Sequence, residues 1–158
     1  MSTSKQLAKH LNEVYFGGNW TTVSLKSAIE DISWNQAVTK IQNFNTIAAL
    51  VYHINYYVHE VASALQGNDL QAQDELSFNH PPIQSQADWD KMLDQCWVDA
   101  RVFASLIEKI SDAQLHDFFQ AEKYGTYFRN LMGIIEHAHY HLGQIILIKK
   151  MLSTDSKN

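Results

Sequence analysis

Apolar residues recur three and four positions apart over most of this chain, the spacing that places them on one face of an α-helix. The pattern covers residues 4–16, 23–32, 45–65, 86–110 and 127–151. No stretch shows the strict alternation of apolar and polar residues that is typical of a half-buried strand. We therefore predict an all-α fold.

Capping and helix-breaking residues separate these helical windows. Gly17-Gly18 and Gly67 follow two of them, and glycine is common just after a helix end. Ser85, with Asp88 three positions later, resembles a capping box in which Asp replaces the usual Glu. Residues 33–35, with the sequence Ser-Trp-Asn, are expected to form a turn.

One long polar segment, residues 67–85, carries both prolines and separates the windows 45–65 and 86–110. A helix of about 24 residues is about 36 Å long, whereas 19 extended residues span about 60 Å. The segment can therefore travel the full length of a helix and leave its two neighbours parallel. We predict a four-helix bundle with a long crossover loop between helices two and three. It forms a single domain, residues 1–152, followed by a polar C-terminal tail, residues 153–158.

Composition and charge exclude several classes of function. The net charge is −5 and Lys and Arg do not cluster, so we expect no nucleic-acid binding. No apolar run approaches the roughly 20 residues of a membrane span, and the N-terminus lacks the apolar core of a secretory signal. We therefore expect no membrane association and a cytoplasmic protein. Cys96 is the single cysteine, which excludes an intrachain disulfide, and its apolar surroundings predict a buried position.

The candidate chemistry begins with a histidine pair in the last window. His137 and His141 are four residues apart, so their imidazoles project from one side of a helix, and Gln144 continues that row. His139 points elsewhere. The pair is a weak signal by itself in a chain with 8 His, and Ala138 stands where a zincin carries its catalytic Glu. By spacing alone, both a metal site and a pair of partly buried, hydrogen-bonded histidines fit.

A further histidine lies in the window 45–65. His53 lies within its apolar run, beside Leu50 and Tyr57, so its side chain is expected to face inward. Glu60, seven residues later, shares that side of the helix, whereas His59 faces away. Helix spacing makes Gln144, Glu60 and Tyr140 candidates for orienting metal ligands or bound water.

Three segments together resemble the DinB-like (DinB/YfiT-like) family of metal-dependent four-helix proteins. They are Tyr15-Phe-Gly-Gly-Asn-Trp20, the run Thr46-Ile47…Leu50…His53-Ile54, and His137-Ala-His-Tyr-His141-Leu-Gly-Gln-Ile145. The last is close to the family pattern HxxYHxGQI. Two departures stand out: Ala138 replaces an Asp or Glu that many relatives carry, and Tyr56 and Tyr57 stand where relatives often carry Trp.

The resemblance implies that His53, His137 and His141 are the ligands of one divalent metal ion. Three neutral imidazoles leave open positions for water or substrate, as in catalytic metal sites. Zinc or nickel is favoured, and iron or manganese is compatible with the ligand type. No catalytic residue beyond the ligands can be assigned.

Relatives in this family include S-transferases and isomerases that use low-molecular-weight thiols. The resemblance therefore implies thiol-dependent S-transferase or hydrolase-like chemistry on a small molecule, carried out by a homodimer. The alternative is a non-catalytic, stress-related dimeric module in which the metal is structural.

Overall fold

The computed structural model describes residues 1–155, and within them the regular structure is helical apart from an isolated bridge between Phe118 and Thr126. The all-α prediction is confirmed. The α-helices are α1 (Thr3–Phe16), α2 (Leu25–Ile29), α3 (Trp34–Val38), α4 (Ile47–Leu65), α5 (Gln86–Glu108) and α6 (Tyr127–Asp155). Three short 3₁₀ turns are η1 (Asp74–Leu76), η2 (Gln114–His116) and η3 (Glu122–Tyr124).

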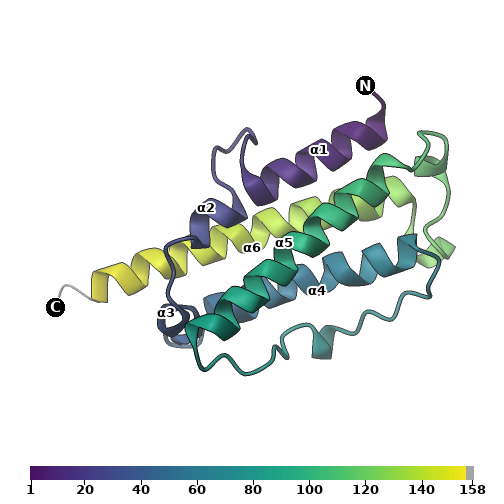
Figure 1. The fold of residues 1–158 in the computed structure, drawn as a ribbon. Helices are drawn as coiled ribbons and strands as arrows, with labels where there is room; N and C mark the ends of the chain where they lie inside the picture. Colours follow the sequence, from purple (N-terminus) through teal and green to yellow (C-terminus); the bar gives the residue numbers. More distant parts are fainter. Residues whose placement is uncertain (156–158) are drawn as a thin grey trace.

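The four longer helices lie side by side, with α1 and α6 running one way and α4 and α5 the other (Figure 1). α5 packs on α1 and α4, and α6 packs on the same two helices. The short helices α2 and α3 connect α1 to α4. Because α4 and α6 are in contact, side chains from these two helices can meet.

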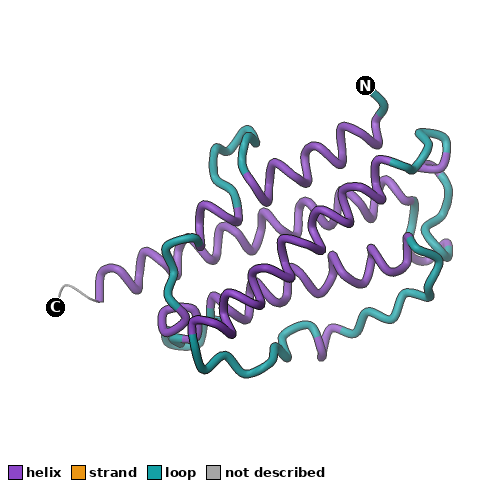
Figure 2. Tube along the Cα trace, in the orientation of Figure 1, coloured by secondary structure: helices purple, strands orange, loops and turns teal. Residues whose placement is uncertain are grey.

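The segment between α4 and α5 runs back along α4 for the length of the helix (Figure 2). Its contacts follow the helix towards its N-terminus: Gln73 donates its N–H to the Tyr56 hydroxyl at 2.9 Å, and the His80 ring lies 6.2 Å from the Tyr52 ring. α5 therefore starts near the beginning of α4 and runs parallel to it (Figure 1). This path brings loop residues over the face of α4 that carries His53.

Helix starts follow the capping chemistry of the sequence. Ser85 caps α5 by accepting from the Asp88 N–H, and Thr126 accepts from the Arg129 N–H at the start of α6. Ser33 does the same for α3, and the Gln36 side chain accepts in return from the Ser33 N–H at 2.9 Å. This complete capping box is why residues 33–35 begin a helix, and the expected turn there is wrong.

The core lies among the four longer helices and is rich in Ile, Leu and Ala. Its largest fully buried side chain, Trp89, donates its indole N–H to the Ile32 carbonyl at 3.0 Å and so ties α5 to the segment after α2. α6 continues to Asp155, beyond the expected end near Met151, and residues 156–158 of the predicted tail lie outside the described residues. None of the described helices is long and apolar enough to cross a membrane.

Cys96 is fully buried in α5, and burial raises the pKa of its thiol well above the ordinary value. Because the thiolate is the reactive form, we expect a thiol reagent to label the folded protein at least about 1000-fold more slowly than the urea-unfolded chain. Absorbance-monitored labelling across a urea titration measures this. Rapid stoichiometric labelling without urea would contradict the buried position.

Candidate metal centre

Three histidines from two helices converge at the contact between α4 and α6. His53 comes from the middle of α4, and His137 and His141 come from successive turns of α6. One ring nitrogen from each lies within 4.8 Å of the others, and the Nε2 atoms of His53 and His137 are 3.0 Å apart. His53 and His141 are buried, and His137 is partly exposed. The three can hold one metal ion.

The loop segment supplies a hydrogen bond that orients His53. Its Nδ1 lies 2.9 Å from the Ser77 hydroxyl, and Ser77 is itself completely buried. The hydroxyl donates its own proton to the Asp74 carbonyl at 2.6 Å, so it accepts from His53. This network places the His53 proton on Nδ1 and leaves the lone pair of Nε2 facing the other two histidines.

A similar contact orients His141. Its Nδ1 lies 2.7 Å from the Gln144 side-chain oxygen, an atom that can only accept. The His141 proton is therefore on Nδ1, which leaves Nε2 with a free lone pair. Gln144 reaches His141 because it lies three residues farther along α6, and its role in orienting a metal ligand stays a prediction.

Aromatic rings close the site around His53. Phe78 stacks on the His53 ring with centroids 3.9 Å apart and planes 9° from parallel. The Tyr57 ring is nearly perpendicular to the rings of His53 and His137, with centroids 5.2 Å and 5.1 Å away. Its hydroxyl donates to the Asp74 carboxylate. These rings restrict the rotation of the imidazoles and keep water from one side of the cluster.

The surroundings favour neutral imidazoles. Burial lowers the pKa of His53 to about 4, with repulsion from His141 adding to the effect. Burial and repulsion from His141 and His53 lower the pKa of His137 to about 4 as well. Burial also lowers the pKa of His141. Since only a neutral imidazole has a lone pair for a metal, the cluster stays competent well below the ordinary histidine pKa of about 6.5.

The donor set fits a divalent ion. Imidazole nitrogens bind zinc at about 2.0–2.1 Å, which puts two ligands of a tetrahedral ion about 3.3 Å apart. The Nε2 atoms of His53 and His137 are already at 3.0 Å, and the third ligand is within 4.8 Å. Two nitrogen lone pairs held this close repel unless a proton or a cation lies between them. A proton on the His137 Nε2 satisfies this contact in the metal-free protein, and a metal ion could take the proton's place.

Other candidate residues lie farther from the cluster. Tyr140 is 65% exposed and touches it only through its ring, 4.8 Å from that of His141. Among the described residues, no hydrogen bond or ion pair joins Glu60 to the three histidines. His59 is exposed and lies 3.8 Å from the Asp99 carboxylate, and His139 faces His10 of α1. Helix geometry had placed these last two away from the site.

Sequence reasoning missed the contribution of the loop. Ser77, Phe78 and Asp74 belong to a segment that the polar composition marked only as a connection. One signal was present: Phe78 is the single aromatic residue among residues 67–85. An isolated aromatic in a polar loop indicates a contact with the folded body, although it does not say which residue is contacted.

A pocket of about 460 Å³ opens beside the cluster. Its lining includes His53, His137 and Tyr57 at one end, and Arg129 and Asn130 of α6 farther along. This volume lies in the range of small-molecule sites. An ion held by the three histidines would therefore face a space that a small molecule can enter.

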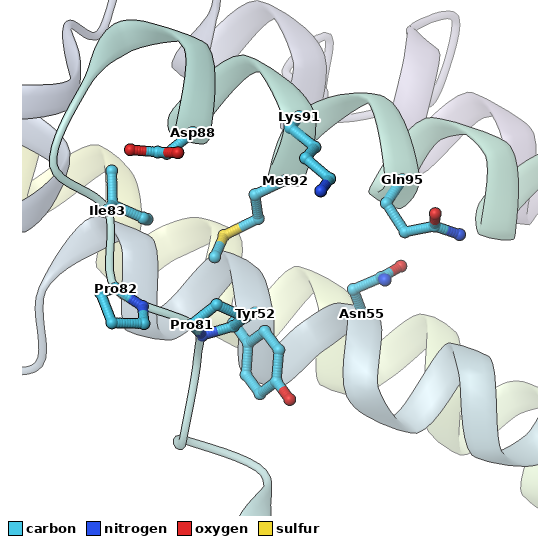
Figure 3. Close-up of a pocket in the computed structure, with 9 residues that line it drawn as sticks. All are labelled: Tyr52, Asn55, Pro81, Pro82, Ile83, Asp88, Lys91, Met92 and Gln95. Carbon is cyan, nitrogen blue, oxygen red and sulfur yellow. The ribbon is translucent and has the colours of Figure 1, made fainter.

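A second pocket, of about 300 Å³, lies between α4, α5 and the end of the loop segment (Figure 3). Tyr52, Pro81 and Met92 are among its apolar lining residues, and Lys91 points towards it from α5 (Figure 3). Its single carboxylate, Asp88, is engaged in capping α5, and its lining contains no histidine or cysteine. It offers no set of metal ligands.

No family model matches the chain, and neither the curated proteins nor the solved structures include a significant match. The geometry of the three histidines and the adjoining pocket is therefore the basis for assigning a function.

The lowered pKa values predict how the metal-free protein responds to acid. Between pH 6.5 and 4 the unfolded chain protonates His53 and His137 while the folded protein does not, so the free energy of unfolding falls as pH falls through this window. Urea midpoints at pH 7 and pH 5 measure the decline. We expect it to be weaker in His137→Gln and unchanged in His59→Ala, and an equal decline in both variants would contradict this origin.

Proposed function

We propose that this protein is a metal-dependent enzyme of the DinB-like type, a four-helix bundle with a long crossover loop between its second and third main helices. His53, His137 and His141 bind one divalent ion, with zinc or nickel favoured over iron or manganese. The enzyme carries out thiol-dependent transfer or hydrolysis on a small molecule. The observation that carries the proposal is the convergence of three imidazole nitrogens beside an open pocket.

The chain's own residues prepare the site for such an ion. Ser77 and Gln144 hold the protons of His53 and His141 on Nδ1, which leaves the Nε2 atom of each ring free to bind a metal ion. Phe78 and Tyr57 limit water on one side. A bound divalent ion lowers the pKa of a coordinated water or thiol and so supplies a nucleophile at neutral pH.

The alternative is a structural metal in a dimeric, stress-related module. Structural zinc sites are usually closed by four protein ligands. The cluster in the described part of the chain contains three, and a pocket adjoins two of them. These two features favour chemistry over a purely structural role. The homodimer and the use of a low-molecular-weight thiol stay predictions.

The first test is metal binding by the three histidines. Zinc or cobalt should bind at one equivalent, and each of His53→Ala, His137→Ala and His141→Ala should weaken binding by at least about 100-fold because one of three ligands is lost. At a free metal concentration of about 100 Kd, the ion should stabilise the wild type by about 2.7 kcal/mol. Calorimetric titration and thermal melts measure both effects.

His59→Ala is the matched control on α4, since its ring is exposed and paired with Asp99. We expect it to bind metal like the wild type. Equal losses in His59→Ala and His53→Ala, or a wild type that stays metal-free after dialysis against zinc, would refute the proposed site.

The second test concerns the loop. Ser77→Ala removes the acceptor of the His53 Nδ1 proton, so zinc affinity should fall about 10- to 100-fold while the fold is retained. Ser63→Ala is the control, because within the described part of the chain this hydroxyl, on the same helix as His53, hydrogen-bonds only to Asn68. Competition with a chromophoric chelator gives both affinities. Wild-type affinity in Ser77→Ala would show that the loop does not orient His53.

A further inference from the structure

One face of α6 carries both a member of the histidine cluster and an arginine. Arg129, Gly133 and His137 follow one another at four-residue intervals, and all three line the same pocket. Eight residues of helix span about 12 Å. The pocket is therefore elongated along α6, with His53 and His137 at one end and Arg129 at the other.

Arg129 is held in place by the turn that precedes α6. Its Nη1 donates to the Tyr124 carbonyl at 3.2 Å. Its Cδ lies so close to Gly125 that a Cβ added there would be 2.9 Å away, and Gly125 has a φ of +76°. The arginine thus folds back over a residue without a side chain. Among the described residues, no carboxylate forms an ion pair with it, so most of its N–H donors can bind a ligand.

Gly133 forms the floor between the two ends. Glycine in the interior of a helix is less stable than alanine, yet a Cβ at Gly133 would meet no atom within 4 Å. Close packing within the chain therefore gives no reason for glycine at this position. Its absent side chain leaves room in the pocket over the middle of the face.

The remaining lining defines the ligand's chemistry. The sides are largely apolar, formed by Val61, Leu70, Ala72 and Ile134. Glu136 adds a carboxylate near the His137 end, which disfavours an anionic group there unless a metal ion compensates it. An uncompensated negative charge is therefore favoured at Arg129.

We propose that this pocket binds a small, elongated carboxylate. Its anionic group pairs with Arg129, its apolar middle lies over Gly133, and its other end reaches the three histidines. The proposal rests on the proposed metal site and adds the class of substrate. Arg129 selects the carboxylate through charge-assisted hydrogen bonds.

The test uses cobalt-loaded protein and two probes, 6-mercaptohexanoate and the uncharged 6-mercaptohexanol. A thiolate that binds cobalt gives a charge-transfer band, so each dissociation constant can be measured by absorbance. We expect the carboxylate probe to bind at least about tenfold more tightly than the alcohol. Arg129→Gln should reduce that ratio to about one and leave cobalt content and alcohol binding unchanged.

Gly133→Leu should weaken the binding of both probes at least about tenfold, because the leucine side chain would occupy the middle of the pocket. Gly143→Leu is the control, because Gly143 lies on the same helix, also has open space at its Cβ, and does not line the pocket. Gly133→Ala should raise the melting temperature, which shows that the position tolerates a side chain.

An equal ratio of probe affinities in wild type and Arg129→Gln, with cobalt bound, would overturn the carboxylate proposal alone. Failure to take up cobalt would instead refute the metal site.

Discussion

The packing of α4 against α6 is the contact on which the candidate site depends. It brings His53 to His137, with Nε2 atoms 3.0 Å apart, although the two residues are 84 positions apart in the chain. The same contact creates a cost, since burial and repulsion from neighbouring histidines, chiefly His141, lower the pKa values of both rings to about 4. A proton shared between His53 and His137 satisfies two of the three clustered rings. One cation within reach of all three would satisfy them together.

The loop between α4 and α5 turns this contact into an organised site. It lies along α4, and its buried Ser77 and its Phe78 ring orient His53 and cover it. The loop therefore has two roles, because its length allows α4 and α5 to run parallel and its side chains complete the histidine cluster. Its residues Leu70 and Ala72 also line the pocket that adjoins His53 and His137 and contains Arg129. The loop therefore covers part of the cluster and forms part of the pocket beside it.

The two ends of the pocket have different origins. The histidines come from the helix interior, where neighbouring turns fix their directions. Arg129 depends on the turn at Gly125, whose backbone conformation and missing side chain allow the arginine to fold back. Gly133 leaves space between them, although a Cβ at this position would meet no atom within 4 Å, so packing does not require a glycine there. One helix thus supplies His137, Gly133 and Arg129 to the same pocket, and the proposed metal and carboxylate sites would lie at its two ends.

The sequence by itself determined the helical class, the main helix positions and the common face of His137, His141 and Gln144, because these depend on local periodicity and capping. It also marked His53 as inward-facing. The resemblance to the DinB-like family added the prediction that His53 is a metal ligand together with His137 and His141. Only the tertiary structure decided that Ser77 and Phe78 complete the site and that Arg129 shares its pocket. Such contacts link positions far apart in the chain, and no periodic pattern records them. The difference between the predicted turn at residues 33–35 and the start of α3 at Trp34 has a local cause, the capping box between Ser33 and Gln36.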